Sequence, residues 1–299
     1  MTTRKIAAET TGPVTIDASL LGNGGAISVQ AIADCERATL TISTTDEDGP
    51  AATAVREAML RQSATGLNVS VTGQGGSNCG STIITGGGVT VVQHSGNFQG
   101  GVINGGFFSG DVYMNGVKVS GQAMVVTGTA PIKITAIVPP GSKVIGRTDS
   151  ADIEAIGTFA LVSGHTQSGD LRVDDAEKVT ASTKSGSVTV NKASDISAKT
   201  MSGGVYLNIT DVVDASTMSG SIDIQDFAGT ARLKTMSGSI RAHATAGGDI
   251  DAKTMSGSIN ITATAAALDE RLDIRPRSMS GSINVPSRRI PDSGPRRRR

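Results

Sequence analysis

The sequence predicts an all-β protein, folded as a single-domain parallel β-solenoid with coils of about 17–19 residues. Three observations predict it. The hexapeptide Thr-Met-Ser-Gly-Ser-Ile occurs three times verbatim, and weaker copies recur at a regular interval. Aliphatic residues stand at the same places in every copy. The chain of 299 residues has 38 Gly, no Trp and only seven Phe plus Tyr, so its core must be built from small and β-branched residues.

Each copy is numbered here from the Ser that precedes its key Gly, and this Ser is called the origin. The origins are Ser150 (degenerate), Ser168, Ser185, Ser202, Ser219, Ser237, Ser256 and Ser280. The spacings are 18, 17, 17, 17, 18, 19 and 24 residues. Because a unit of this length cannot bury its own apolar face, successive units must stack with like strands parallel and about 4.8 Å apart. Crossover handedness favours a right-handed coil.

Alternation within each copy predicts which side chains face inward. The third residue after the origin is aliphatic in every copy: Ile153, Leu171, Val188, Val205, Ile222, Ile240, Ile259 and Ile283. The fifth is also apolar, whereas the fourth is mostly polar. Upstream, small and aliphatic residues alternate and end on a hydroxyl two residues before the origin: Thr148, Thr166, Thr183, Thr200, Thr217, Thr235, Thr254 and Ser278. We therefore expect two short strands per coil, joined at a Ser-Gly corner where Gly takes a positive φ.

The remaining segments follow in chain order. We expect an N-terminal tail at 1–12, an irregular N-terminal part of the solenoid at 13–140, regular repeats at 141–285 and a disordered basic tail at 286–299. Within 13–140 the patterns predict one short helix at 51–61, a Gly-rich insert at 73–121, and strands at Pro13–Asp17, Ala26–Gln30, Ala38–Ser43, Leu67–Thr72 and Lys133–Val138.

Two of these segments have alternative interpretations. The insert is either a set of narrow solenoid turns or an adaptable lobe that presents Phe107 and Phe108 to a partner. The tail is either a solvated terminus that blunts the last coil or a weak contact for an anionic surface, RNA or DNA. Its six arginines are Arg288, Arg289, Arg296, Arg297, Arg298 and Arg299.

A column of five methionines directly precedes the origins: Met201, Met218, Met236, Met255 and Met279. Strand parity places these thioethers outward, opposite to the Thr column, where they would form a surface for a partner or for self-association. The alternative is that the Ser-Gly corner twists them against the neighbouring coil.

Few residues suggest catalysis. Asp152 and Asp170 stack one coil apart and either bind a cation, share a proton or form a solvated corner. Glu154 with Arg172, and Asp223 with Arg241, are expected to form exposed cross-strand ion pairs. His94, His165 and His243 form no cluster, and no phosphate-binding loop is present. We therefore expect no catalytic site, no cofactor and no metal.

Cysteine content, net charge and the N-terminal residues bear on the partners and the cellular location of the protein. Cys35 and Cys79 are expected to be free thiols rather than a disulfide, and neither has metal-ligand spacing. Twenty-seven basic side chains balance 27 acidic ones, which argues against a nucleic-acid binder as a whole. The N-terminus lacks the apolar region of a secretory signal, and no run spans a membrane. We expect a cytoplasmic protein, extracellular only by another export route.

The segment Val-Pro-Pro-Gly-Ser-Lys-Val at 138–144, followed by repeated Ser-Gly-Asp-Leu, Ser-Gly-Ser-Val and Ser-Gly-Ser-Ile, resembles the bacterial putative-adhesin β-solenoid family, a domain of unknown function. The resemblance spans Pro13 to Val285. It implies a parallel solenoid and brings no catalytic residues. The expected function is a non-catalytic scaffold that self-associates, or binds a protein partner, along its methionine column or at its ends. The alternatives are a carbohydrate-active β-helix enzyme and an exported adhesin.

Overall fold

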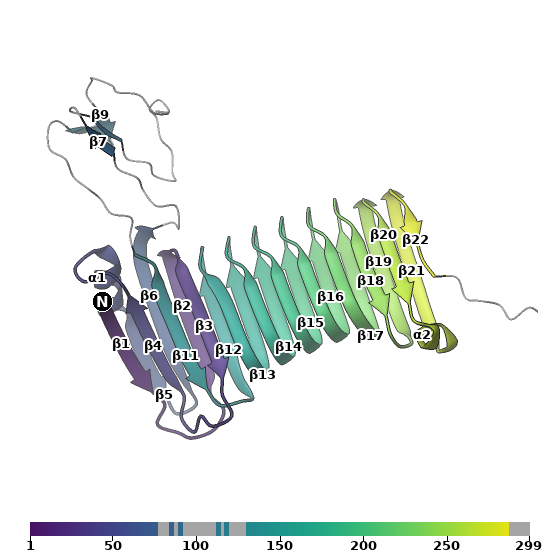
Figure 1. The fold of residues 1–299 in the computed structure, drawn as a ribbon, viewed down its shortest axis with the longest axis horizontal. Helices are drawn as coiled ribbons and strands as arrows, with labels where there is room; N and C mark the ends of the chain where they lie inside the picture. The colour runs from purple at the N-terminus through teal and green to yellow at the C-terminus, as the bar shows by residue number, and fades with distance from the viewer. Residues whose placement is uncertain (77–83, 87–88, 92–111, 115–116, 120–129, 287–299) are drawn as a thin grey trace, which may run out of the picture.

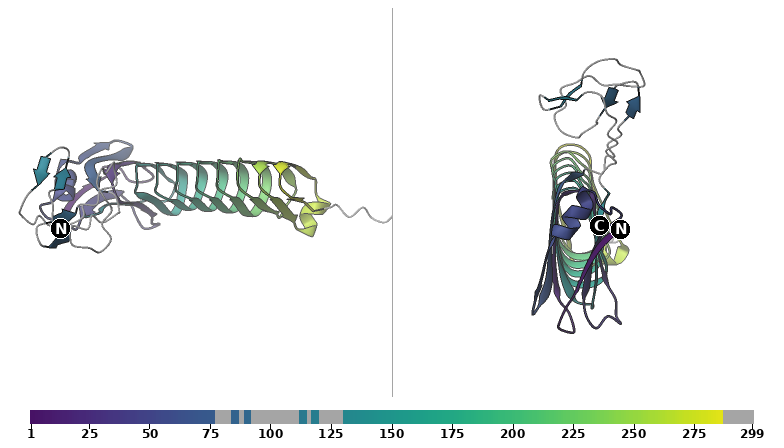
Figure 2. Two further views of the ribbon diagram at one scale, coloured as in Figure 1. Left: turned by 90° about the horizontal axis from the view of Figure 1, so that it is seen from above. Right: turned by 90° about the vertical axis from the view of Figure 1, so that its left-hand side faces the viewer.

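The computed structural model describes residues 1–76, 84–86, 89–91, 112–114, 117–119 and 130–286. The chain forms an elongated β-solenoid whose coils stack along the long axis, and its end view is a flattened oval (Figures 1 and 2). One 18-stranded sheet contains all the coils, and like strands pair in parallel. The predicted fold class is therefore confirmed, although two helices rather than one occur in the described residues.

Each regular coil consists of a single long strand that bends midway. These strands are β13 (Asp152–Thr166), β14 (Leu171–Thr183), β15 (Val188–Thr200), β16 (Val205–Thr217) and β17 (Ile222–Thr235). The half of the strand that follows the Ser-Gly corner lies on one face of the oval, which we call the first face. The other half lies on the second face. The strands end at the Ser-Gly corner, as predicted. The chain also bends at a second corner, where it passes from the first face to the second, but the strand continues through this bend.

The last coils divide into two strands each, as the sequence pattern predicts. They comprise β18 (Ile240–Ala244) and β19 (Gly248–Ser256), then β20 (Ile259–Ala263) and β21 (Leu272–Ser280), and finally β22 (Ile283–Asn284). The unpredicted helix α2 (Ala265–Asp269) begins at Thr264, whose hydroxyl accepts the N–H of Ala267. This helix lies within the 24-residue spacing between the origins Ser256 and Ser280, so it accounts for the longest repeat.

The core contains the columns that the alternation predicts. Val188, Val205, Ile222, Ile240 and Ile259 are fully buried and lie directly over one another in register. One inward column was missed: Phe159, Ala176, Ala193, Thr210, Phe227 and Ala244. Four of its members stand eight residues after their origins, so the step from the inward fifth position breaks the period-two alternation. Phe159 and Ala244 stand nine and seven residues after theirs.

The glycine of the Ser-Gly corner is required for a different reason from the predicted positive φ. Of these corner glycines only Gly281 has a positive φ; Gly169, Gly186, Gly203, Gly220, Gly238 and Gly257 do not. A Cβ at Gly203 would instead overlap the carbonyl group of Gly186 in the preceding coil, and the same overlap recurs at Gly186 and Gly220. Glycine is therefore needed because successive backbones approach too closely for a side chain.

Positive-φ glycines occur at the second corner instead. Gly157, with φ 99°, and Gly229, with φ 133°, lie where the register shifts between β13 and β14 and between β16 and β17. Both belong to 18-residue coils, so the extra residue is accommodated as a β-bulge at this corner.

The buried threonines stabilise the corner with their hydroxyl groups. The Thr217 hydroxyl accepts the N–H of Gly220 at 2.9 Å and donates to the carbonyl of Gly203, in the preceding coil, at 3.3 Å. Thr235 donates in the same way to Gly220 O at 3.2 Å. The inward position of this column is confirmed, and its hydroxyl groups explain why Thr rather than Val recurs there.

Thr210 is the exception among the described residues, because its buried hydroxyl has no hydrogen-bond partner. An unpaired buried hydroxyl costs about 1–3 kcal/mol of stability, which an apolar side chain of the same shape avoids. We expect Thr210→Val to raise the free energy of unfolding by about 1 kcal/mol in urea titrations. Thr217→Val is the matched control, and we expect it to lower stability. A loss of stability in Thr210→Val would show that the Thr210 hydroxyl does have a hydrogen-bond partner.

The N-terminal part continues both faces of the solenoid. Its elements are β1 (Thr2–Ala7), β2 (Thr15–Asn23), β3 (Gly25–Ala31), β4 (Thr39–Thr44), α1 (Pro50–Glu57), β5 (Met59–Ser63), β6 (Gly66–Gly76), β11 (Ile132–Val138) and β12 (Ser142–Thr148). The first face runs from β13 through β3, β11 and β4 to β1, and the second runs through β12, β2 and β6 to β5.

This part differs from the sequence prediction in three respects. Residues 2–7 are not a tail, because β1 pairs antiparallel with β4. The pairs β4–β11 and β5–β6 are also antiparallel, so the N-terminal part is a two-layered mixed sheet rather than irregular coils. The helix ends at Glu57, and the last residues of the predicted helix belong to β5.

The insert contributes four short strands: β7 (Ile84–Gly86), β8 (Val89–Val91), β9 (Val112–Met114) and β10 (Val117–Val119). They form two separate antiparallel pairs, so the interpretation as further solenoid turns is wrong for these strands. Phe107, Phe108 and Cys79 lie outside the described residues, as do the six arginines of the tail.

Candidate interaction surfaces

The methionine edge is the surface formed by Met201, Met218, Met236, Met255 and Met279 at the Ser-Gly corners. The first four side chains are 45–49% exposed, and Met279 is 82% exposed. Their backbones are fixed by hydrogen bonds between coils: Ser219 N–H donates to Met201 O, and Ser237 N–H donates to Met218 O, both at 2.8 Å. Parity therefore holds through the corner, and the thioethers point outward at one-coil intervals of about 4.8 Å.

A row of cations runs beside this edge on the second face. Lys199, Lys234, Lys253 and Arg277 each lie two residues before a methionine and point outward with it. Lys253 is paired with Asp251 at 2.6 Å. Within the described residues, the other three cations form no ion pair. This row was not among the predicted site residues, although the same strand parity that places the methionines outward also places these cations outward.

The character of the edge changes along the solenoid. In the three coils before Met201 the equivalent position holds Asp149, Gln167 and Lys184, which are joined by hydrogen bonds of 2.7 and 3.1 Å. The apolar edge is thus confined to the C-terminal coils, where thioethers replace a ladder of hydrogen-bonded polar groups.

The two stacked carboxylates have a structural use. Asp152 Oδ1 accepts the backbone N–H of Asp170 at 2.8 Å, and Asp170 Oδ1 accepts that of Ser187 at 2.9 Å. The remaining oxygen of Asp170 binds Arg172 at 3.0 Å. Each carboxylate therefore ties its coil to the next one. In the described ranges, no group of three or more Cys, His, Asp and Glu side chains could hold a metal ion.

The predicted cross-strand ion pairs are half right. Arg241 lies 3.8 Å from Asp223, as expected, but Arg172 binds Asp170 of its own coil instead of Glu154. Arg275 binds Asp273 at 2.5 Å, and this hydrogen bond raises the pKa of a guanidinium that is already charged at any usable pH. These pairs are exposed and contribute little to stability.

Outward-facing amides form a polar ladder on the first face, which the sequence analysis missed. Asn208 donates to Asn191 at 2.9 Å, and Asn191 donates to Asp174 at 3.2 Å. The exposed ring of Tyr206 borders a shallow groove of about 340 Å³ beside this ladder. His165 and His243 lie apart, and His243 contacts Thr262 at 2.8 Å.

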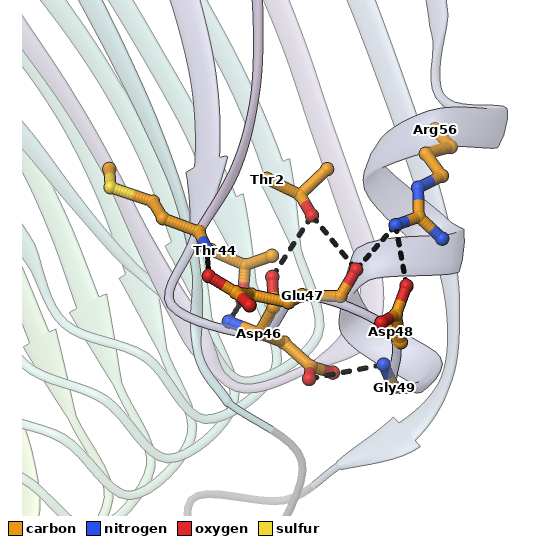
Figure 3. Close-up of polar contacts among 8 residues, drawn as sticks. Thr2, Thr44, Asp46, Glu47, Asp48, Gly49 and Arg56 are labelled. Atoms are coloured by element: carbon orange, nitrogen blue, oxygen red, sulfur yellow. Dashed lines mark hydrogen bonds and ion pairs between the residues drawn. The ribbon is translucent and has the colours of Figure 1, made fainter.

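The N-terminal end of the solenoid is closed. Helix α1 lies across it and buries Ala51, Ala52, Ala54 and Val55 (Figure 2). The turn that leads into the helix is held by polar contacts (Figure 3): Asp46 accepts the N–H of Gly49 at 3.1 Å, and Arg56 binds Asp48 at 3.1 Å and also donates to the carbonyl of Glu47. The edge strands β1 and β5 carry charged residues, which discourage strand addition.

The C-terminal end is open. Ile283 and Val285 are 44% and 38% exposed, whereas their equivalents one coil earlier, Ile259 and Ile261, are 0% and 1% exposed. Among the described strands, β21 pairs only with β19 along its length and β22 only with β20. Among the described residues, the last coil therefore presents an uncovered cross-section of the core, together with backbone groups that pair with no further strand.

Cys35 is a half-buried free thiol whose Sγ lies 3.2 Å from Arg37 O. Neither of the described helices is long and apolar enough to cross a membrane.

Two solved structures align with most of this chain. A putative adhesin from Parabacteroides distasonis ATCC 8503 aligns over 95% of this chain and 96% of its own, with 10% identity and a TM-score of 0.37. A putative adhesin from Bacteroides fragilis NCTC 9343 aligns over 95% and 97%, with 14% identity and a TM-score of 0.31. A search of curated proteins gives no match. The profile of the Toastrack DUF4097 family matches residues 85–295, starting within the insert rather than at Pro13. The chain belongs to the Toastrack DUF4097 family, a domain of unknown function.

Proposed function

We propose that this protein is a non-catalytic β-solenoid scaffold that self-associates through its C-terminal coil. The observation that carries the proposal is the exposure of Ile283 and Val285, whose equivalents in the preceding coil are completely covered. A strand edge with unpaired backbone groups and uncovered aliphatic side chains is a template for another strand of the same kind.

A second copy of the chain is the occupant that fits this end. The 13 residues that follow Pro286 contain one aliphatic residue, Ile290, together with two prolines and six arginines. Such a segment cannot supply an alternating apolar strand or a full set of backbone donors. Another solenoid end has the same oval outline and the same spacing of coils, and it offers the same unpaired groups.

The geometry favours a closed dimer in which two C-terminal ends meet. The N-terminal end is covered by α1 and edged with charges, so it gives no second site for head-to-tail growth. Antiparallel pairing of two methionine edges is less favourable, because it would bring the rows of Lys199, Lys234 and Lys253 together.

The non-catalytic part of the proposal is supported by the use made of the best candidate carboxylates. Asp152 and Asp170 each accept a backbone N–H of the next coil, so they serve the stacking of the solenoid. The carbohydrate-active alternative requires carboxylates directed at a substrate.

We expect sedimentation velocity and native mass spectrometry of the full chain to show a concentration-dependent dimer. The double variant Ile283→Lys with Val285→Lys should weaken it at least ~10-fold, because two uncovered aliphatic side chains on each copy are replaced by charges. Ile209→Lys with Val212→Lys is the matched control, because these side chains are equally exposed but lie on the side of the solenoid.

A chain that stays monomeric at every concentration, or an open filament, would contradict the proposed dimer. Equal weakening by the control variant would show that the effect comes from charge rather than from the C-terminal coil. Turnover of a glycan that disappears in Asp152→Asn would overturn the non-catalytic assignment.

A further inference from the structure

The methionine edge is a straight, convex and apolar line on a rigid support. Its thioethers project from five successive corners whose backbones are hydrogen-bonded from coil to coil. Four steps of about 4.8 Å give it a length of roughly 19 Å. None of the four shallow grooves described on the solenoid, the largest of which is lined by β2, β5 and β6, includes one of these methionines. The edge is thus a protruding line, suited to insert into a deformable interface and not to accommodate a side chain of a partner.

The charge around the edge has one sign. The five corner segments are 199–204, 216–221, 234–239, 253–258 and 277–282. They contain the four cations of the neighbouring row and no Asp or Glu. The nearest acidic side chains along the chain are Asp214, Asp223 and Asp251, each two residues outside a corner segment. Asp251 is paired with Lys253, and Asp223 lies 3.8 Å from Arg241. An occupant of this surface must therefore be anionic and must also accept apolar side chains.

We propose that the methionine edge binds the surface of an anionic phospholipid bilayer. All the thioethers lie on one line, so a flat interface contacts them together, whereas a folded protein would need a groove of matching length. Flexible, unbranched Met side chains fill the irregular space between lipid chains. Lys199, Lys234 and Arg277 lie two residues behind the line, at the depth where their charged ends reach the phosphates.

The binding is peripheral and depends on both components. Apolar insertion alone is weak for five partly exposed side chains, and each cation near an anionic leaflet strengthens binding about fivefold. The bound solenoid would lie with its long axis parallel to the membrane, leaving the first face and the N-terminal part free for other contacts.

We expect the full chain to co-sediment with vesicles of phosphatidylcholine and phosphatidylserine but not with vesicles of phosphatidylcholine alone, and to be released by salt. The triple variant Lys199→Gln, Lys234→Gln and Arg277→Gln should weaken binding about 100-fold. A control triple, Lys5→Gln, Lys133→Gln and Lys143→Gln, removes the same charge from exposed positions elsewhere and should change binding little.

The absence of Trp from the chain allows insertion to be measured directly. Met236→Trp provides a single fluorophore on the edge, and its emission should shift to the blue when phosphatidylserine vesicles are added. Met59→Trp, at an exposed methionine of the N-terminal part, is the matched control and should not shift. Circular dichroism establishes that each variant retains its strands.

Three outcomes would overturn the proposal. The first is no binding to phosphatidylserine vesicles at low salt. The second is an unchanged Trp emission at position 236 despite binding. The third is loss of all binding when the six tail arginines are replaced by Gln, with no effect of the Lys199, Lys234 and Arg277 triple, because the tail alone would then account for the attraction.

Discussion

Gly203→Ala is expected to lower the free energy of unfolding by about 3 kcal/mol, near the upper end of the usual cost of overpacking. The new Cβ would overlap the carbonyl group of Gly186 in the preceding coil. Both groups belong to the backbone, so neither can rotate away, and relief requires the two coils to separate. Separation would stretch the hydrogen bonds that join Ser202 to Lys184 and Val188 to Gly204 between these two coils.

The neighbouring glycine provides the control for this prediction. A Cβ at Gly204 would meet only the outer atoms of the Tyr206 ring, at 2.8 Å, and this half-exposed ring can move. Other coils carry Ser at the same place, namely Ser187, Ser221, Ser239 and Ser258. Gly204→Ala should therefore cost less than about 1 kcal/mol in urea titrations followed by circular dichroism. Equal midpoints for the two variants would refute the steric account of the corner.

Phe227→Ala should destabilise the protein by about 3–5 kcal/mol, because it removes a fully buried ring. The residues that flank Phe227 in its inward column are Thr210 and Ala244, which are too small to fill the resulting cavity. Tyr206→Ala is the matched control, since it removes an aromatic ring that is about half exposed, and it should cost much less.

The loss should also be distributed unevenly along the solenoid. Coils contact mainly their neighbours, so a weakened junction at Phe227 uncouples the C-terminal coils from the others. Hydrogen exchange should then show faster exchange in β18–β21 than in β13–β15. Uniform acceleration across all coils would contradict this nearest-neighbour behaviour.

Much of the solenoid could be predicted from the sequence because each coil repeats the environment of the coil before it. The inward columns of Ile, Val and Thr follow from period-two alternation and from the recurrence of the Ser-Gly origin in every coil, which are both local properties. The outward direction of the methionines followed from the same parity, but the twist of the corner left an alternative that only their exposure in the structure excluded. The methionine edge and the solenoid ends belonged to the predicted interaction sites, whereas the cation row did not, and the sequence did not indicate which end stays open.

The rest was decided by contacts between residues far apart in the chain. The repeat pattern predicted the Ser-Gly corner but not the reason for its glycine. A Cβ there would overlap the carbonyl group of the preceding coil, and this contact exists only after the coils have stacked. The pairing of β1 with β4, and of β12 with β2 across more than 120 residues, has no periodic signal. Nor did any pattern show that α1 covers one end while Ile283 stays uncovered at the other. By itself, then, the sequence determined the stacked coils, because periodicity records what each coil repeats. Only the tertiary structure decided how the two ends finish, because a solenoid's ends lack the neighbours that a repeat implies.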